Sequence, residues 1–420
     1  MNTQSDPIAA MDEITRESLR EIVDRHGTPA YAFDLRRLRA QAEKLRRNLP
    51  AAEILYSLKS NASLGICDVL ADCGIGADVA SAGEFATALE AGFPPERIFV
   101  AGPFKLPETV ARLRETPQAV VSVDSESELR MLASSGLSNK IVLRLRPDFG
   151  SCAVVPAGSE SRFGFTRDDL DCLPDFLGDC PLEVIGFHVF AGSQVLDADE
   201  VISHLTQALD LSLRAAESIG VVPTLINLGG GLGTPYAADD QELDLNRVGE
   251  ALSRLASRAA PARLVLELGR YLVAQSGWYL TSVLGAQTNQ GRPAVVVDGG
   301  VHQRADMCGL CLRTKARPPI ALGRESSSFQ PTDVLGCLSL PDDVLIESAS
   351  LPPLSPGDAL AFPNAGAYGI WSSPAIFHGS PLPAEAGFDE TGIHLMRERL
   401  PASSVLNGQR RVPSARAAST

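Results

Sequence analysis

A lysine that follows an apolar run is the first residue of this chain whose surroundings suggest chemistry. The segment Ile54-Leu-Tyr-Ser-Leu-Lys59-Ser-Asn61 has the pattern of a buried strand that delivers Lys59 to its carboxyl end. An amine held there loses hydration, and desolvation lowers its pKa. A neutral amine can attack an aldehyde and form a Schiff base. A single lysine after a strand is usually a surface residue, so this interpretation depends on the other motifs.

A glycine-rich segment, Asn227-Leu-Gly-Gly-Gly-Leu-Gly233, offers backbone amides to an anion. Successive glycines expose N–H groups and allow a phosphate to approach closely. Taken alone, the segment is better explained as a tight turn between a strand and a helix. Its place after the seventh strand of a predicted barrel favours a phosphate site, because such barrels usually bind phosphate there.

Two charged residues end another apolar run. Glu267 ends the run 263–267, and Arg270 follows in the segment Glu267-Leu-Gly-Arg270. If the cofactor is pyridoxal phosphate (PLP), the carboxylate could pair with its pyridinium nitrogen. The arginine could bind a phosphate or a substrate carboxylate through two hydrogen bonds. A surface ion pair is the structural alternative for these two residues.

Two aromatic rings share one face of the run 183–190. His188 and Phe190 are two residues apart, which is the period of a strand, so either ring could stack on a cofactor. Ser193 follows them and could donate a hydrogen bond to a phosphate. The structural alternative for His188 is a hydrogen-bonded histidine of the core.

Apolar runs that alternate with helical patterns predict the scaffold that positions these residues. The predicted strands are 53–58, 76–80, 97–101, 119–123, 140–145, 183–190, 224–228 and 263–267. The predicted helices between them are 62–73, 82–91, 106–115, 126–135, 167–178, 198–219 and 245–258. This alternation predicts an α/β protein with a closed (β/α)8 barrel, whose chemistry takes place at the carboxyl ends of the strands. An open doubly wound sheet is the alternative, which the number of strands disfavours.

The texture of the sequence changes after about residue 275, where short strand-like runs replace helical patterns. These runs are 274–284, 293–298, 333–338, 343–349, 358–362 and 373–378, separated by Pro and Gly. They predict a C-terminal antiparallel β-domain. The strand-like segment Pro29–Asp34, after a helical pattern at Ile14–His26, predicts that the N-terminus completes this domain. The expected divisions are 1–34 in the β-domain, 35–272 in the barrel, 273–400 in the β-domain, and a disordered tail at 401–420.

Composition excludes several classes of partner. The 420 residues carry a formal net charge of -14, which argues against nucleic acid or an anionic membrane surface. No apolar run reaches the ~18 residues of a membrane span, and the polar N-terminus lacks an apolar signal core, so we expect a cytoplasmic protein. Cys308 and Cys311 form one C-x-x-C pair. A structural zinc site would need a second pair, so no metal is expected.

Taken together and in this order, the motifs resemble the fold-type III PLP-dependent decarboxylases, which include diaminopimelate, ornithine and arginine decarboxylases. The resemblance covers about residues 25–390. The matching motifs are Tyr56-Ser-Leu-Lys59, Asp78-Val-Ala-Ser81, Ser161-Arg-Phe-Gly164, Gly192-Ser-Gln194, Gly229-Gly-Gly231, Glu267-Leu-Gly-Arg270 and Gly366-Ala-Tyr368. The resemblance implies a barrel with a β-domain, and a head-to-tail homodimer that shares two active sites.

The resemblance also implies a role for each matching residue. Lys59 would bind PLP covalently, Asp78 and Arg144 would stand near it, and Glu267 would face the pyridine nitrogen. The residues implied around the phosphate are Ser193, Gly230, Gly231, Gly269 and Arg270, together with Tyr368 from the partner subunit. The ring-stacking histidine of the family falls on Phe190, whereas His188 lies two residues earlier, so either ring could cover the cofactor.

One segment departs from the family at the expected substrate site. Diaminopimelate decarboxylases have the motif Gly-Pro-x-Cys-Glu-Ser-x-Asp, which corresponds here to Gly336-Cys-Leu-Ser339-Leu340-Pro-Asp-Asp343. Ser339 replaces the cysteine that delivers a proton, and a hydroxyl is a far weaker acid than a thiol. Ser339 would therefore position water, or another group would supply the proton. The residues expected at the substrate are Ser339, Asp343, Arg270 and Tyr368.

The same segment bears on the identity of the substrate. Leu340 replaces the glutamate that reads the distal end of diaminopimelate, whose ammonium would then lack a partner. The segment Val297-Asp-Gly-Gly-Val-His302 resembles a branch found in antibiotic and exopolysaccharide gene clusters. Some members of that branch resemble enzymes that act on amino acids tethered to an acyl carrier protein. We therefore expect α-decarboxylation of an L-amino acid, of the acidic type if it is carrier-bound, in a secondary-metabolite pathway.

Two alternatives and one possible docking surface remain. The enzyme could act on a free diamino acid such as diaminopimelate or ornithine. A non-catalytic relative that binds partners is a different class of protein, and the presence of Lys59, the glycines and Glu267 argues against it. The basic cluster Arg313, Lys315 and Arg317 could meet an acidic carrier protein or could form a solvated face.

Overall fold

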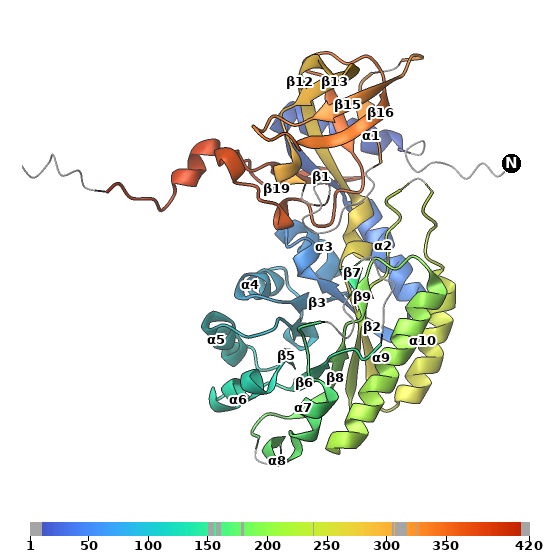
Figure 1. Cartoon of the computed structure of the whole chain (residues 1–420), viewed down its shortest axis with the longest axis vertical. Helices are drawn as coiled ribbons and strands as arrows, with labels where there is room; N and C mark the ends of the chain where they lie inside the picture. The colour runs from blue at the N-terminus through green and yellow to red at the C-terminus, as the bar shows by residue number, and fades with distance from the viewer. Residues whose placement is uncertain are drawn as a thin grey trace, which may run out of the picture.

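The computed structural model shows a barrel joined to a large mixed sheet (Figure 1). It describes residues 11–149, 155–156, 161–177, 180–237, 239–304, 306, 317–324 and 326–412. The pair Cys308 and Cys311 lies outside these residues. None of the helices in the described part of the chain combines the length and the apolar character that a membrane crossing needs.

The predicted barrel is present, and all its strand pairs are parallel. Its closed order is β10-β11-β2-β3-β4-β5-β6-β8. The strands are β2 (Ala52–Ser57), β3 (Gly76–Val79), β4 (Ile98–Val100), β5 (Val120–Val123), β6 (Ile141–Leu145), β8 (Val184–Val189), β10 (Leu225–Gly230) and β11 (Arg263–Leu268). Seven of their side chains fill the barrel interior as one apolar cluster: Leu55, Phe99, Val120, Val142, Ile185, Leu225 and Val265.

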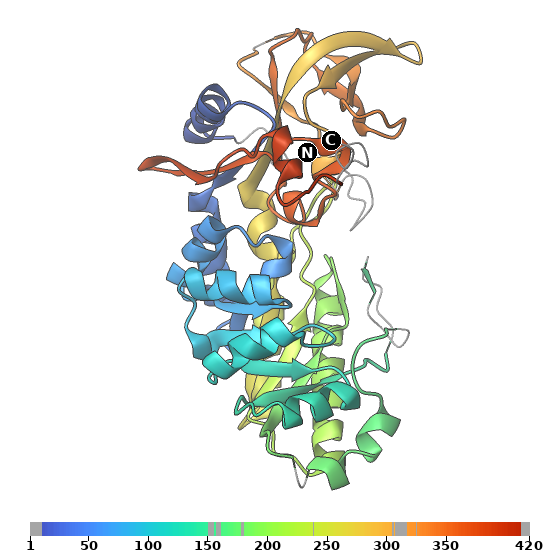
Figure 2. The same cartoon turned by 90° about the vertical axis from the view of Figure 1, so that its left-hand side faces the viewer.

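Helices surround the barrel, as Figures 1 and 2 show from two sides. They are α3 (Leu64–Asp72), α4 (Ala82–Glu90), α5 (Pro107–Glu115), α6 (Glu126–Ser134), α7 (Arg167–Asp171), α8 (Pro174–Leu177), α9 (Ala198–Ile219) and α10 (Leu245–Ala259). Ser81, Ser125 and Asp197 cap α4, α6 and α9 by accepting a backbone N–H of the first turn. The helix predicted at 167–178 is two short helices, because a proline begins the second one.

One helix was not predicted. Helix α2 (Leu35–Asn48) lies between β1 and β2 and is rich in arginine. Its buried side chains are Leu35, Leu38, Ala42 and Leu45, which recur at helical spacing. That spacing was the available signal, and the many charges around it obscured the pattern.

The second part of the structure is a nine-stranded sheet. Seven of its strands follow the path β16-β15-β13-β12-β1-β18-β19, while β17 also pairs with β12 and β14 pairs with β17. The strands are β1 (Ala30–Asp34), β12 (Gly277–Asn289), β13 (Arg292–Val297), β14 (Ile320–Leu322), β15 (Gln330–Leu335), β16 (Val344–Leu351), β17 (Ala359–Phe362), β18 (Ala384–Asp389) and β19 (Gly392–Arg397). Strand β1 lies between β12 and β18, so the N-terminal segment completes the sheet as predicted. The pairs β1–β18 and β13–β15 are parallel, so the sheet is mixed, not purely antiparallel as expected.

The remaining elements are α1 and several short ones. They are α1 (Glu13–His26), η1 (Leu58–Ser60), η2 (Pro95–Arg97), β7 (Val155–Pro156), β9 (Gly192–Ser193), α11 (Arg270–Val273), η3 (Ala274–Ser276), η4 (Val301–Gln303), η5 (Ile370–Ser372), η6 (Phe377–Gly379) and η7 (Ala402–Leu406), where η is a 3₁₀ helix. The strand predicted at 373–378 is wrong, because 3₁₀ turns occupy this stretch. The expected disordered tail begins with η7, so that prediction is wrong for residues 402–406. The domain boundaries stay a prediction.

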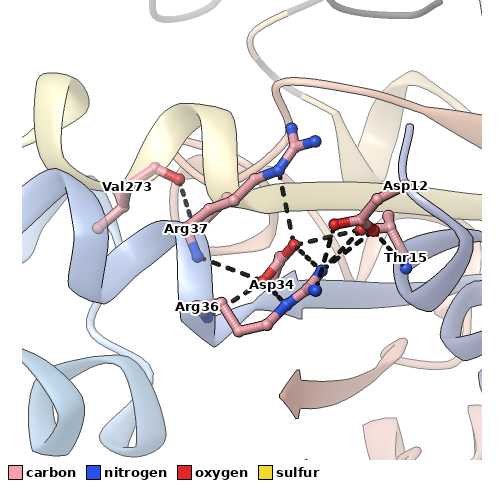
Figure 3. Close-up of polar contacts among 7 residues, drawn as sticks. Asp12, Thr15, Asp34, Arg36, Arg37 and Val273 are labelled. Carbon is pink, nitrogen blue, oxygen red and sulfur yellow. Dashed lines mark hydrogen bonds and ion pairs between the residues drawn. The ribbon is translucent and has the colours of Figure 1, made fainter. Parts of the chain in front are cut away.

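A single buried carboxylate connects α1, β1 and α2 (Figure 3). Asp34 ends β1 and caps α2, where it accepts the backbone N–H groups of Arg36 and Arg37. Its two oxygens also accept Arg36 Nε at 3.0 Å and Arg36 Nη2 at 2.7 Å. Thr15 of α1 donates its hydroxyl to the same carboxylate at 3.2 Å. Asp34 therefore fixes the angle at which the chain leaves the sheet for the barrel.

We predict that Asp34→Ala lowers the free energy of unfolding by about 3 kcal/mol, because a buried ion pair and a helix cap are lost together. Denaturant unfolding monitored by circular dichroism measures this change. The exposed Asp24 on α1 provides the matched control, and Asp24→Ala should change the stability by less than about 0.5 kcal/mol. Equal effects of the two substitutions would contradict the role given to Asp34.

Candidate active site

Lys59 lies at the carboxyl end of β2, within η1, and its side chain is open to the mouth of the barrel. The turn around it is fixed by the sheet part of the chain. Asn61 Nδ2 donates to Gly366 O at 2.9 Å, and Tyr368 N donates to Ser60 O at 2.7 Å. The predicted placement of the lysine is therefore present, with residues 366–368 directly beside it.

The charge of Lys59 differs from the sequence expectation. Loss of hydration alone would lower the pKa of Lys59, but the negative charges of Asp78 and Glu267 raise it above its ordinary value. The expectation of a neutral amine is therefore wrong for the protein chain by itself. The ammonium has to release a proton before its nitrogen can attack a carbonyl carbon.

Asp78, on β3, is the first carboxylate that acts on this amine. It is buried, and its Oδ2 accepts the hydroxyl of Ser57 at 2.7 Å. Its Oδ1 has no hydrogen-bond partner among the described residues. Burial and the nearby charge of Glu267 raise the pKa of Asp78, so this carboxyl group holds a proton more readily than an exposed aspartate.

Glu267, on β11, is held in a buried polar cluster at the centre of the mouth. Asn227 Nδ2 donates to its Oε1 at 2.7 Å, and His188 Nε2 lies 3.4 Å from the same oxygen without hydrogen-bond geometry. Burial opposes the charged form, but His188, Lys59 and Arg144 outweigh it, so the pKa of Glu267 stays below its usual range. Burial also lowers the pKa of His188, which favours the neutral ring.

The two candidate rings of β8 occupy different places. His188 is buried, and its Nδ1 lies 2.9 Å from the hydroxyl of Ser122 on β5, a residue that sequence reasoning missed. Phe190 lies at the mouth, where its ring centre is 5.3 Å from Lys59 Nζ. The structure thus brings Phe190 to the amine and places His188 behind Glu267.

Two glycines of the predicted phosphate loop have no room for a side chain. A Cβ on Gly230 would lie 1.8 Å from Glu267 O, and one on Gly231 would lie 2.5 Å from Gly192 O. Gly231 also has a φ of 103°, which favours glycine. The hydroxyl of Ser193 has no hydrogen bond among the described residues, and this serine follows Gly192. The two loops therefore pack backbone against backbone at the mouth.

Arg270 is the charged residue of the predicted phosphate site. It follows Gly269 at the start of α11 and is 5% exposed. Its Nη1 donates to the hydroxyl of Tyr236 at 3.0 Å, and its guanidinium lies 4.5 Å from the ring centre of Tyr368. Its Nε has no partner among the described residues. Tyr236 was not predicted, although it follows the glycine loop within three residues of Gly233.

The origin of Tyr368 corrects one expectation. The resemblance implies that this tyrosine reaches the phosphate from a partner subunit. In the structure, Tyr368 of the same chain stacks on Arg270 and bonds to Ser60. The expectation is wrong because the turn after β17 returns to the barrel mouth of its own chain.

Arg144 lies where β6 reaches the mouth, beside His188 in the register of the barrel. Its Nη1 is 3.1 Å from Asp124 Oδ1, and its guanidinium lies 4.7 Å from the ring centre of Phe163. The positive charge of this guanidinium also acts to lower the pKa of Lys59 and the pKa of Glu267. Its place near the lysine therefore agrees with the predicted position.

Ser339 and Asp343 are not brought to the lysine within this chain. Asp343 is buried and accepts the backbone N–H groups of Val301 and Leu338, each at 2.8 Å. Its carboxylate therefore holds its own loop together. Ser339 is exposed in the connection between β15 and β16, and it makes no hydrogen bond to another described residue. Contacts of these two residues with a substrate stay predictions.

The basic cluster also differs from its prediction. Arg313 and Lys315 lie outside the described residues. Arg317 is 9% exposed, and its guanidinium donates to Tyr236 O at 3.2 Å and to Ala237 O at 3.0 Å. Arg317 thus binds the loop after β10 and is not part of a solvated basic face.

Comparison with known proteins places this geometry in a family. The family model for the pyridoxal binding domain of pyridoxal-dependent decarboxylases matches residues 35–274. The L-glutamyl-[BtrI acyl-carrier protein] decarboxylase of Niallia circulans is 31% identical over 414 residues, covering 94% of this chain and 97% of that protein. A diaminopimelate decarboxylase of Methanothermobacter thermautotrophicus is 30% identical over 411 residues, covering 93% of each chain.

The solved structures agree with this placement. The crystal structure of Helicobacter pylori diaminopimelate decarboxylase with L-lysine is 25% identical to this chain, with a TM-score of 0.83. The match covers 92% of this chain and 98% of that chain. The similarity therefore includes both the barrel and the sheet.

The residues present also fit PLP chemically. The cofactor needs an amine for its aldehyde, a carboxylate for its pyridinium nitrogen and donors for its phosphate. Lys59, Glu267 and the partnerless Nε of Arg270 offer these groups at one mouth of one barrel. On the combined evidence of motif, fold and similarity, this chain belongs to the pyridoxal-dependent decarboxylases and is an amino acid decarboxylase that uses pyridoxal 5'-phosphate.

Proposed function

We propose that the enzyme removes the α-carboxylate of an acidic amino acid that is tethered to an acyl carrier protein, in a secondary-metabolite pathway such as antibiotic biosynthesis. The observation that carries this proposal is Leu340, which is 40% exposed where diaminopimelate enzymes have a glutamate. An apolar side chain gives a distal ammonium no partner. The similarity to a carrier-protein glutamyl decarboxylase supports the same substrate class.

The chain's own residues divide the work at the barrel mouth. When bound, PLP supplies an aldehyde for the amine and a ring that accepts the electrons left by departing CO2. Lys59 would hold the cofactor through its Nζ, and Asp78 Oδ1 would accept the proton that this amine releases. Glu267 would offer its carboxylate to the ring nitrogen. Phe190, whose ring centre lies 5.3 Å from Lys59 Nζ, would shield this place from water.

The phosphate of the cofactor would be held by residues that the protein chain already keeps in place. Arg270 offers its guanidinium, and the stacked ring of Tyr368 keeps it in place. The loop with Gly230 and Gly231 allows close backbone approach, and Ser193 offers a hydroxyl. Few of these groups have to move when the cofactor binds, which favours tight binding.

A homodimer with shared sites is part of this proposal. Ser339 is exposed and makes no bond to the barrel mouth among the described residues, so a second copy of the chain would supply this loop to the site. There its hydroxyl would position the water that returns a proton to the α-carbon.

The substrate class is tested by comparing CO2 release from carrier-bound glutamate, free glutamate, free diaminopimelate and free ornithine. We expect kcat/KM for carrier-bound glutamate to exceed that for each free amino acid by at least about tenfold, since each 1.4 kcal/mol of added binding gives that factor. Rapid turnover of a free diamino acid would instead identify the second candidate, a decarboxylase of free diaminopimelate or ornithine. Several relatives are named as diaminopimelate decarboxylases.

Lys59→Ala should abolish decarboxylation and covalent attachment of the cofactor. Borohydride reduction followed by mass spectrometry should place a pyridoxyl group on Lys59 in the wild type and on no residue in the variant. Lys140→Ala changes an exposed lysine before β6 and serves as the control, with unchanged labelling. Full activity of the Lys59 variant would exclude the mechanism.

Glu267→Gln should reduce kcat by about 100- to 1000-fold, the usual cost of removing one electrostatic stabiliser from an active site. The amide can still accept a hydrogen bond from Asn227, so the fold and cofactor loading should persist. Glu250→Gln, on the exposed face of α10, should leave kcat unchanged. Steady-state kinetics on both variants decide the point, and a fully active Glu267→Gln enzyme would refute the assigned role.

A further inference from the structure

A second cavity opens on the same end of the barrel, beside the site. It has a volume of about 270 Å³, and Arg146, Arg162, Phe163 and Asp124 are among its lining residues. These residues follow β5 and β6, so the cavity lies at the carboxyl ends of the strands, as Lys59 does. Nothing in the proposed roles of the site uses this cavity.

Two arginines of the cavity have no carboxylate partner within the described segments. Arg146 Nε is buried and has no hydrogen-bond partner among the described residues. Arg162 is exposed, and its guanidinium lies 4.6 Å from the ring centre of Phe163. Neither arginine forms an ion pair in the described part of the chain. As far as the described residues go, no acidic group occupies either guanidinium, which leaves both available to an anion.

The acidic residues of the same cavity are already bonded to other groups. Asp124 pairs with Arg144 at 3.1 Å and accepts the backbone N–H of Gly164. Glu126 pairs with Arg130, with 2.6 Å between Oε1 and Nη2. Asp169 accepts the N–H and the hydroxyl of Thr166 at 2.8 and 2.7 Å. Asp124 and Glu126 are therefore paired with other arginines, and one oxygen of Asp169 is occupied by hydrogen bonds from Thr166.

One aromatic ring joins this cavity to the catalytic mouth. Phe163 lies between Arg162, at 4.6 Å, and Arg144, at 4.7 Å. The charge of Arg144 in turn interacts with those of Lys59 and Glu267 in the mouth. An extended substrate that enters the mouth beside Phe163 would thus pass the two free arginines.

We propose, resting on the proposed function, that Arg146 and Arg162 bind the phosphodiester of the phosphopantetheine arm that tethers the substrate to its carrier protein. A phosphodiester is an anion at a distance from the reacting carbon, and arginine binds phosphate oxygens through paired N–H donors. A free amino acid has no such group. The cavity would therefore select tethered substrates by their linker and not by their side chain.

Two synthetic thioesters test this inference: glutamyl-phosphopantetheine and glutamyl-pantetheine, which lacks the phosphate. For the wild-type holoenzyme we expect kcat/KM to be at least about tenfold higher with the phosphate, mainly through a lower KM. The ratio of the two kcat/KM values should fall toward one in Arg162→Ala and in the double variant Arg146→Ala/Arg162→Ala. Arg254→Ala, an exposed arginine on α10, should keep the wild-type ratio.

The outcomes separate this inference from the proposed function. If the wild type decarboxylates both thioesters equally well, the phosphate site is refuted while the tethered-substrate proposal stands. The same holds if the double variant keeps the wild-type ratio. If the wild type accepts free amino acids but neither thioester, both proposals fail. Arg162 is exposed, so Arg162→Ala tests the site even if Arg146→Ala does not fold.

Discussion

The structure depends on keeping one ammonium and two carboxylates together at the mouth of an apolar barrel. The charges of Asp78 and Glu267 raise the pKa of Lys59, and burial together with the charge of Glu267 raises the pKa of Asp78. Removing any one of the three charges would change the protonation of the other two. A positively charged lysine also attracts an anionic cofactor before it reacts with it, so the resting charge favours loading.

Polar side chains from the neighbouring strands hold these charged groups in place through hydrogen bonds. Asn227 donates to Glu267, Ser57 donates to Asp78, and Ser122 lies against His188 behind them. Among the described site residues, three buried side-chain atoms lack a hydrogen-bond partner: His188 Nε2, Asp78 Oδ1 and Arg270 Nε. The last two lie where a proton or a cofactor has to be received. Buried polar atoms without partners are costly, so the free chain stores binding capacity at these two points.

Much of the fold could be predicted because barrel strands are buried on both faces and are therefore short apolar runs in the sequence. Lys59, Glu267 and the glycine loop could be placed because each ends such a run. Three things could not be predicted, since they depend on contacts between distant segments: the charge of Lys59, the return of Tyr368 to its own barrel and the burial of Arg317. The strand expected at 373–378 failed because prolines and 3₁₀ turns can also carry apolar residues.

The turn that carries the lysine is completed from the far end of the chain. Asn61 and Gly366, which share a hydrogen bond, are separated by 305 positions. During translation, Asn61 emerges from the ribosome long before Gly366. The turn that carries Lys59 therefore lacks this hydrogen bond while the barrel is being made. Stable capture of the vitamin-derived aldehyde is accordingly a late event, which takes place once translation has passed Tyr368. A chain that carries bound cofactor is therefore a chain whose synthesis has passed that point.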